Sequence, residues 1–423
     1  MVSFSSISKR LSDIRLRCQD STATDALSFA HFSSAFEIPV SHWTALVGRD
    51  EPMLMVPYLA ALEQHPVAGL RFHYMLAYEG TVPVAAFYFQ EFDLRINKID
   101  RNVDTDRVAD AGSLISQAKD VMARGLEQFG VRMLVLGNVY LTGQYGARFV
   151  DGMSADRKAE VLLKSVERVM KDNLSGKKIR TVLYKDLTDD LFDAIHGADD
   201  DLIPFHIQPQ MVIDLRDWKS MDEYLDSFSS KYRVRAKSAF KKFEQISHRE
   251  LTLADMQRLE TRMWELYSEV ESKADFVMAA LPRGYFTDLK LALDNRYRVV
   301  GYFKEDGTMV GFYSTLLGTT RNMAHYIGMD YSVNQECALY LNIIYHQVAD
   351  GIADGVKEVD TGRTALEIKS TVGCEPHQLR LLARHTNGVT NSIARLFLGN
   401  LRQPEWVQRR PFKELVEVEE RTV

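Results

Sequence analysis

The chain has 423 residues, which is too long for a single hydrophobic core of ordinary size, so we expect two domains. Apolar residues make up 46% and charged residues 26% of the sequence, a balance that excludes a disordered chain. The formal net charge of −6 excludes a protein that attracts nucleic acid over its whole surface, so contact with a polyanion requires a local basic patch.

The N-terminal segment and the cysteines favour a cytoplasmic protein. Residues 1–18, MVSFSSISKRLSDIRLRC, have no long apolar run behind their basic residues, so we expect no secretory signal. No stretch approaches the roughly 18 apolar residues that suggest a membrane span. Cys18, Cys337 and Cys374 lie far apart without metal-ligand spacing, so we expect reduced thiols and no metal site.

The first predicted elements are a β-hairpin and a helix followed by a strand. Residues 72–92, FHYMLAYEGTVPVAAFYFQEF, form two apolar runs joined by a polar turn with Gly80, which is typical of a hairpin. Residues 115–138, ISQAKDVMARGLEQFGVRMLVLGN, predict a helix that stops at Gly130 and a strand that ends at Gly137.

An exposed crossing is predicted at residues 191–209, LFDAIHGADDDLIPFHIQP, because Asp, Gly and Pro are frequent there. We place the domain boundary near this crossing. The N-terminal domain then spans residues 1–200, and the C-terminal domain spans residues 201–423.

Residues 226–246, DSFSSKYRVRAKSAFKKFEQI, predict a basic helix that Ser229 or Ser230 can cap. Phe240 and Phe243 lie on its apolar face. Its charged face includes Lys231, Arg235, Lys237, Lys241 and Lys242. Such a helix can clamp a phosphate or a nucleotide sugar, or it can be a solvated face that nearby acids neutralise. Both interpretations stay open.

The C-terminal half repeats the hairpin and the helix–strand unit. Residues 256–273, MQRLETRMWELYSEVESK, predict an amphipathic helix that packs on a core. Residues 297–317, YRVVGYFKEDGTMVGFYSTLL, predict a second hairpin with Gly307 in its turn. Residues 340–363, YLNIIYHQVADGIADGVKEVDTGR, predict a second helix, glycine stop and strand.

The glycines of the two helix–strand units have matching intervals. Gly130 precedes Gly137 by the spacing that separates Gly355 from Gly362, which favours two copies of one β-β-α-β module. The alternative is that helices, glycine stops and strands are common in α/β proteins and share no ancestry here.

Charged residues gather where the last of these strands ends. In GVKEVDTGRTALEIKSTVGC, Asp360, Arg363 and Lys369 follow an apolar run, at a sheet edge where ligands commonly bind. Arg363 and Lys369 can donate to an oxyanion or a phosphate. Alternatively, Arg363 pairs with Asp360 at the surface while Lys369 is solvated. The matching positions of the first copy, Asn138 and Gln144, carry no cation, so we place the reaction centre in the second copy.

Residues 325–348, HYIGMDYSVNQECALYLNIIYHQV, predict a strand that leads into a helix. His325 or Asp330 can accept a proton there, and a histidine titrates near neutral pH. The alternative for His325 is a hydrogen-bonded residue of the core.

Together these segments resemble the second module of Fem-like and related tandem acyltransferases of the GNAT superfamily. The resemblance rests on the order of LPRGYFTDLKLAL, the hairpin YRVVGYFKEDGTMVGFY, a helix and DTGRTALEIKSTVG. The basic stretch SSKYRVRAKSAFKK is similar to the segment that opens that module. Residues 220–385 carry the resemblance, and residues 70–185 carry it as a weaker first copy.

The resemblance implies an α/β (α+β) fold with two tandem GNAT-like domains, each a mixed, mostly antiparallel sheet flanked by helices. It implies an N-acyltransferase that moves an acyl or aminoacyl group from an activated donor to an amine. The acceptor would be a small molecule or a cell-envelope precursor.

The resemblance also implies roles for individual residues. Lys369 would stabilise charge in the transition state, and Arg363 would fix a carboxylate or phosphate. Asp360 would orient both cations, while His325 or Asp330 would relay a proton. Substrate contacts would come from the basic helix at residues 230–242 and from the strand and helix after it, through Lys231, Arg233, Arg235, Lys237, Tyr326 and Asn342.

Three co-substrates are compatible with the resemblance, and no tightly bound cofactor is expected. They are acyl-CoA, an acyl carrier thioester, and aminoacyl-tRNA bound by the basic helix. SVNQECALYL around Ala338 has no glycine for a pyrophosphate loop, and RVADAGSL at residues 107–114 comes closer, which disfavours CoA. A non-catalytic tandem-GNAT module that binds a nucleotide or a cell-wall precursor is the remaining alternative.

Overall fold

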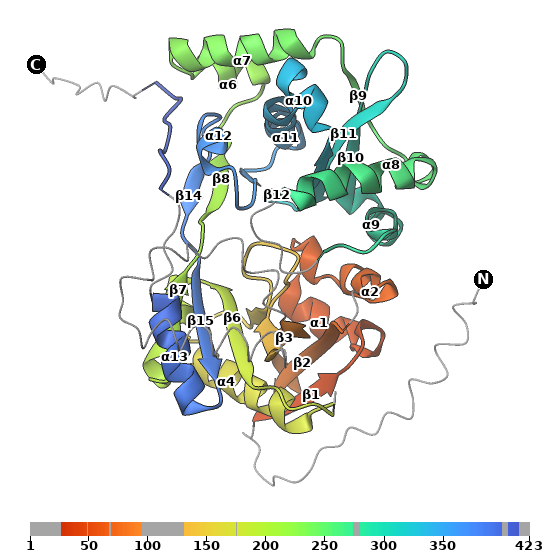
Figure 1. Ribbon diagram of the computed structural model, residues 1–423. Helices are drawn as coiled ribbons and strands as arrows, with labels where there is room; N and C mark the ends of the chain where they lie inside the picture. Colours follow the sequence, from red (N-terminus) through yellow and green to blue (C-terminus); the bar gives the residue numbers. More distant parts are fainter. Residues whose placement is uncertain are drawn as a thin grey trace, which may run out of the picture.

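The computed structural model describes residues 27–48, 50–66, 69–94, 131–174, 176–273, 280–399 and 405–413. They form two lobes, each a mixed and mostly antiparallel sheet with helices packed against it (Figure 1). This confirms the expected α+β class. The predicted helix at residues 115–130, the loop at residues 107–114 and Cys18 lie outside the described residues.

The first sheet lies in the lower lobe of Figure 1 and has the strand order β1-β2-β3-β4-β6-β15-β7, with β5 paired to β3. β4 and β6 are parallel, and the other neighbours are antiparallel. The strands are β1 (Leu27–Phe32), β2 (Arg71–Glu79), β3 (Val82–Leu94), β4 (Val131–Leu136), β5 (Ala147–Phe149), β6 (Thr181–Leu187), β7 (Ile203–His206) and β15 (Arg380–His385). The helices are α1 (Val40–Val47), α2 (Val56–Gln64), α4 (Ala155–Asp172), α5 (Asp189–Ala198) and α13 (Gly388–Gly399).

The second sheet lies in the upper lobe and has the order β14-β8-β13-β12-β11-β10-β9. Its strands are β8 (Gln210–Asp214), β9 (Ser247–Glu250), β10 (Tyr297–Phe303), β11 (Met309–Leu317), β12 (Arg321–Met329), β13 (Glu358–Asp360) and β14 (Glu375–His377). Its helices are α6 (Met221–Asp226), α7 (Ser230–Phe243), α8 (Leu253–Ser272), α9 (Tyr285–Leu293), α10 (Tyr331–Cys337), α11 (Leu339–Asp354) and α12 (Leu366–Ser370).

The two sheets repeat one topology. Read from β1 and from β9, their fourth and fifth strands form the parallel pair, β4 with β6 and β12 with β13. β4 therefore corresponds to β12 and not to β13, so the predicted match of Gly137 with Gly362 is wrong. Asn138 and Gln144 are accordingly not the counterparts of the predicted cations. The spacing agreed because a glycine stop and a short strand follow many helices.

The first sheet contains two strands from beyond residue 200, β7 and β15. β8 directly follows β7 but joins the second sheet, whereas β15, near the C-terminus, returns to lie between β6 and β7. Helix α13 packs beside β7 and β15. Sheet membership therefore does not follow the expected boundary at residue 200, because the first lobe also contains residues 203–206 and 380–399.

Both predicted hairpins and the predicted amphipathic helix are present. Gly80 between β2 and β3 has φ of 60°, and Gly307 between β10 and β11 has φ of 81°, conformations that a residue with a side chain rarely adopts. The amphipathic helix is α8, which begins with a capping box formed by Thr252 and Asp255. Its buried residues are Met256, Met263, Leu266 and Tyr267.

The lobes share a core where α2 and α9 pack against each other (Figure 1). One hydrophobic cluster runs through this contact and includes Leu62 of α2, Leu289 of α9 and tyrosines from both lobes. A continuous apolar contact of this kind favours a fixed arrangement of the lobes over a freely moving hinge.

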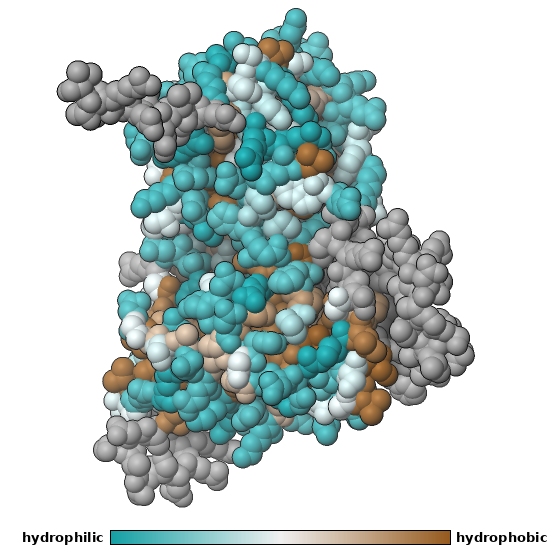
Figure 2. All heavy atoms as spheres, turned by 90° about the vertical axis from the view of Figure 1, so that its left-hand side faces the viewer, coloured by the Kyte–Doolittle hydropathy of each residue, from teal (hydrophilic) through white to brown (hydrophobic). Residues whose placement is uncertain are grey.

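The outer surface is mostly hydrophilic on the face shown in Figure 2, where hydrophobic atoms appear in separate patches. Large exposed apolar side chains are scattered over different helices, such as Val234 on α7, Leu291 on α9 and Val389 on α13. Every helix among the described residues is too short or too polar to serve as a membrane span.

Candidate functional site

Lys369 lies on the short helix α12, and its ammonium group is buried. Nζ donates to the backbone carbonyls of Thr361, Gly362 and Arg363 at 2.5, 3.3 and 2.7 Å. An ammonium group has three N–H donors, so this geometry leaves none for an oxyanion. Burial lowers the pKa of Lys369 to about 8. The geometry thus corrects the expected role: Lys369 holds the loop that follows β13.

Asp360 and Arg363 do not pair with each other. Asp360 is fully buried and accepts hydrogen bonds from Gln210 Nε2 and from a backbone N–H, and burial raises the pKa of its carboxyl group. Arg363 instead reaches the other lobe, where Nη2 lies 2.5 Å from Asp186 Oδ1 and Nε donates to Gln208 O at 2.7 Å. Asp360 therefore does not orient the two cations as expected.

Asp186, near the end of β6, is the centre of an interdomain clasp formed by Lys185, Asp186 and Arg363. Its side chain is fully buried and also accepts from the backbone N–H of Gly143 at 2.9 Å. Burial acts to raise the pKa of Asp186, but the two cations outweigh it and lower that pKa. Since β6 and β13 occupy the same position in the two sheets, the ion pair joins equivalent strand ends.

The predicted basic helix is α7, with Ala236, Ala239 and Phe243 buried. Ser229 occupies its N-cap position, but the side chain makes no capping hydrogen bond, contrary to expectation. Arg233 is held by Asp226 and by a backbone carbonyl. The other cations are exposed, and in the described ranges they form no ion pair: Lys231, Arg235, Lys237, Lys241 and Lys242.

The N-terminus of α11 is occupied by the protein's own side chains. Asn334 Oδ1 accepts from the backbone N–H of Tyr340 at 2.8 Å. Asn342 Nδ2 donates to three backbone carbonyls, including Ala239 O on α7 and Ala338 O before α11. Asn342 therefore braces two helices, and the expected substrate contact from its amide nitrogen is not available.

Asp330 is the N-cap residue of α10. Its carboxylate accepts from Ser332 N at 3.0 Å and lies 3.5 Å from Arg262 Nη2. Burial acts to raise the pKa of Asp330, but the hydrogen bonds from Ser332 and the charge of Arg262 lower it. Asp330 is thus an ionised capping residue and separate from the hydrogen bonds of His325 described next.

A β-bulge on β12 positions the other predicted proton acceptor. Ser314 of β11 lies opposite two residues of β12, His325 and Tyr326, because the pairing shifts between Tyr313 and Thr315. Ser314 Oγ closes the bulge by accepting from Tyr326 N at 3.1 Å. A bulge re-aims side chains, and here the hydroxyl of Tyr326 reaches the first lobe, where it donates to Tyr140 O.

His325 is partly buried and lies among hydroxyl groups. Its Nε2 is 3.0 Å from Tyr285 Oη, and its Nδ1 is 3.3 Å from Tyr297 Oη and 3.4 Å from Ser314 Oγ. Burial lowers the pKa of His325 to about 3, so the ring is neutral at physiological pH. A neutral ring has one bare nitrogen, which can accept a hydrogen bond or a proton.

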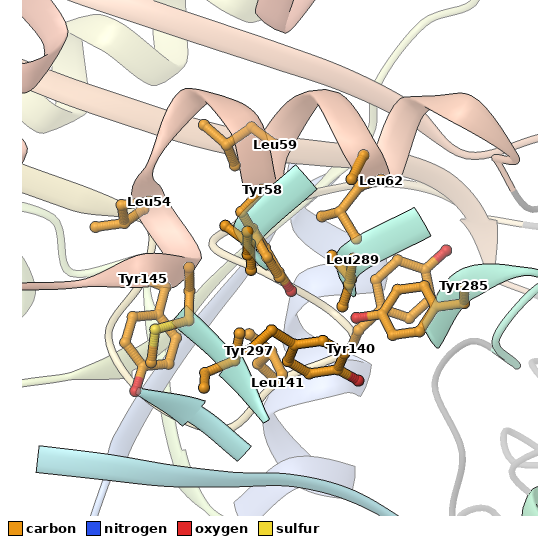
Figure 3. Packing of buried hydrophobic residues seen from close by; sticks show 14 of the residues in the cluster. Leu54, Tyr58, Leu59, Leu62, Tyr140, Leu141, Tyr145, Tyr285, Leu289 and Tyr297 are labelled. Atoms are coloured by element: carbon orange, nitrogen blue, oxygen red, sulfur yellow. The ribbon is translucent and has the colours of Figure 1, made fainter. Parts of the chain in front are cut away.

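Tyrosines of the second lobe surround this histidine, and tyrosines of the first lobe pack against them. Figure 3 shows Tyr58 of α2 and Tyr140 of the first lobe in one packed group with Tyr285 and Tyr297 of the second. Tyr326 Oη donates to Tyr140 O at 2.7 Å across the contact. We call these five tyrosines and His325 the interdomain tyrosine cluster. It combines apolar ring faces with hydroxyls that can donate or accept hydrogen bonds.

Of this cluster, His325 and Tyr326 were predicted from the sequence, whereas Tyr58, Tyr140, Tyr285 and Tyr297 were not. Tyr285 lies 40 residues and Tyr297 lies 28 residues before His325. Their sequence signal, apolar positions at the ends of a helix and a strand, is that of core packing. The fold of the second lobe brings their hydroxyls to the histidine.

The chain folds into two lobes of one repeated topology, each a mixed and mostly antiparallel sheet flanked by helices. No protein-family model matches the chain, and no curated protein matches its sequence. Among solved structures, the crystal structure of FemX matches with a TM-score of 0.52 and 10% identity over 87% of this chain and 100% of FemX. At this identity the match shows the fold alone.

Two further solved structures match less well. A tandem GNAT protein from the clavulanic acid biosynthesis pathway has a TM-score of 0.47 and 11% identity, over 86% of this chain and 99% of that protein. N-myristoyltransferase of Saccharomyces cerevisiae, solved with myristoyl-CoA, has a TM-score of 0.42 and 11% identity, over 88% and 82% of the two chains.

Proposed function

We propose that this protein transfers an activated acyl or aminoacyl group to an amine at the interdomain tyrosine cluster. The observation that supports this proposal most is the bulge on β12, which brings a neutral His325 to within 3.0 Å of Tyr285 Oη where the lobes meet. Fem-like resemblance in the second module and a FemX-like fold are consistent with the same chemistry.

The proposed reaction is nucleophilic acyl substitution. The amine nitrogen attacks the carbonyl carbon of a thioester or ester, a C–N bond forms, and the C–S or C–O bond breaks. The proton lost by the amine passes to the bare nitrogen of His325, through the hydroxyl of Tyr285, and is returned to the leaving thiol or hydroxyl. Because the pKa of His325 is about 3, the ring holds this proton only in transit.

The candidate donors are acyl-CoA, a carrier-bound thioester and aminoacyl-tRNA. Asn334 already binds a backbone N–H at the start of α11, where helix N-termini often hold phosphate. The exposed cations on α7 form a separate surface that can contact an anion. The contact of Asn334 disfavours CoA bound at the start of α11. The cations of α7 support aminoacyl-tRNA as the alternative donor.

A donor comparison tests the proposal. The full chain is incubated with a lysine-containing peptide and either radiolabelled acetyl-CoA or total tRNA charged with radiolabelled amino acids. We expect label to appear in amide linkage on the peptide, and His325→Gln to lower its rate at least about a hundredfold. His248→Gln, on the exposed strand β9, is the matched control and should retain the rate.

The outcomes separate the candidates. Loss of transfer after ribonuclease treatment identifies tRNA as the donor. In that case Lys237→Gln with Lys241→Gln should weaken tRNA binding and reduce its salt slope by about 2. Absence of labelled peptide with both donors, together with saturable binding of either, contradicts the proposal and supports a non-catalytic binding module.

A further inference from the structure

The last described segment of the chain, residues 405–413, contacts the second lobe, although the helix before it, α13, belongs to the first lobe. It forms no helix or extended strand, and a single β-bridge joins Phe412 to Phe228. It runs beside α12 (Figure 1). We call residues 405–413 the C-terminal strap.

The strap binds the turn between α6 and α7 as an extended peptide. Ser229 N donates to Pro411 O, and Lys413 N donates to Ser227 O, both at 2.8 Å. Main-chain bonds of this antiparallel kind are the means by which a peptide adds to an exposed edge of a protein. The strap is therefore held by its backbone as well as by its side chains.

Phe412 fills a box of aromatic rings. Its ring centroid lies 5.4 Å from those of Trp218 and Phe228, and the guanidinium carbon of Arg216 lies 4.3 Å from that centroid. Gly373 leaves room for the ring, because a Cβ atom at this glycine would lie 2.3 Å from Phe412 Cζ. The box is thus shaped for one aromatic side chain, and a single methyl group would close it.

The second lobe builds this box without help from the strap. Tyr224 is fully buried, and its ring packs against Trp218 and Phe228 at 5.1 and 4.8 Å. Its hydroxyl donates to Val372 O at 2.6 Å, which fixes the ring. Phe412, by contrast, is only partly buried against this hydrophobic cluster. The box is therefore a preformed pocket, and Phe412 occupies it as the anchor of a bound peptide would.

Charge matches the strap to the surface beside the pocket. Arg409 Nε donates to the carboxylate of Glu367 on α12 at 3.0 Å, and Arg409 N donates to Ser370 Oγ at 2.9 Å. Residues 405–413 carry three basic side chains and one acidic side chain, whereas the whole protein has a net charge of −6. Because the ion pair is half exposed, it orients the strap, while Phe412 supplies most of the affinity.

We propose that this pocket is a peptide-binding site for a short basic sequence with a Pro-Phe pair, and that the C-terminal strap occupies it reversibly in cis. The proposal is independent of acyl transfer. The occupied site also braces α12, whose Lys369 holds the loop that carries Arg363 of the interdomain clasp. The strap thereby links the C-terminal segment to the contact between the lobes.

Binding of the strap sequence in trans to the full chain tests the proposal. The probe is a fluorescein-labelled peptide of residues 405–413, EWVQRRPFK, followed by fluorescence anisotropy. In the wild type the strap competes at a millimolar effective concentration, and Phe412→Ala removes the competing anchor. We expect the peptide to bind Phe412→Ala at least about tenfold more tightly than the wild type. Val407→Ala, at an exposed position of the strap, is the matched control and should match the wild type.

Two further changes test the pocket itself. The peptide with Phe412→Ala keeps its charge and should bind the Phe412→Ala protein at least about tenfold more weakly than the unchanged peptide. Adding Gly373→Ala to that protein places a methyl group in the pocket and should weaken binding of the unchanged peptide equally. Equal binding to the wild type and to Phe412→Ala, or equal binding of the two peptides, would overturn the proposal.

Hydrogen exchange in the wild type needs no substitution. The amides of Arg409 and Lys413 donate to the second lobe from the strap, whereas the amide of Thr361 donates to Met211 O beside the second sheet. A reversible occupant opens without unfolding the lobe, so we expect the two strap amides to exchange at least about a hundredfold faster than that of Thr361. Exchange of all three amides at one rate would show that the strap belongs to the core and would refute its reversible release.

Discussion

Replacing Lys369 with Met distinguishes a catalytic lysine from one that holds a loop. The substitution leaves the buried carbonyl of Thr361 and the partly buried carbonyls of Gly362 and Arg363 without their donor. At about 2 kcal/mol for each unpaired carbonyl, this loss outweighs the roughly 3 kcal/mol relieved by removing a buried ammonium group. We therefore expect Lys369→Met to lower the free energy of unfolding by about 3 kcal/mol at pH 7.

The pH dependence gives a second and independent measure. The pKa of Lys369 is about 8 in the folded protein and 10.5 in its ordinary state. Between these values the unfolded chain binds the proton and the folded chain does not, so wild-type stability should rise with pH there. From pH 8 to pH 9.5 the rise from this group is about 1.5 kcal/mol, and Lys369→Met should lack it.

Urea unfolding followed by tryptophan fluorescence measures both effects through the midpoint at unchanged m-value. Lys413→Met is the control, because Lys413 is exposed and binds a single carbonyl, that of Asp226. Its stability should change by at most about 0.5 kcal/mol. An unchanged midpoint in Lys369→Met, with acyl transfer lowered a hundredfold, would refute the structural role and restore the catalytic one.

Two further predictions concern buried charges. Arg363→Met leaves the carboxylate of Asp186 buried with one cation fewer, so we expect a loss of about 3 to 5 kcal/mol in the free energy of unfolding. The control Arg157→Met removes an exposed ion pair and should change the free energy of unfolding little. Equal effects of the two substitutions would argue against the clasp. His325 has a pKa of about 3 when folded and about 6.5 when unfolded, so stability should fall by about 2 kcal/mol between pH 7 and pH 5, measured by urea unfolding. A pH slope that persists in His325→Gln would show that other groups cause it.

The local parts of the fold could be predicted from the sequence. The hairpins around Gly80 and Gly307 follow from alternating apolar runs and a turn glycine, which act over a few residues. The position of β15 in the first sheet could not be predicted from the sequence. Its six residues, RLLARH, contain no signal for the partner strands, which precede it by more than 170 positions.

The candidate site was predicted less well, for a similar reason. A lysine six residues after an arginine has the same spacing whether its donors face a ligand or the carbonyls of its own loop. His325 was found because its residue type is chemically versatile, but its neighbours Tyr285 and Tyr297 lie 40 and 28 positions away in the sequence. Polar networks assembled by tertiary contacts leave little trace in local sequence patterns.

The return of β15 has a consequence for biosynthesis. While the ribosome is still making the second half, the early sheet has its β6 and β7 edges separated by an empty place for one strand. That gap closes only after residue 385 has left the exit tunnel, so the first lobe cannot complete its sheet from the first half of the chain alone, whereas the strands of the second sheet all lie within residues 210–377. Completion of the first sheet therefore requires most of the polypeptide to be synthesised, because β15 fills the place between β6 and β7.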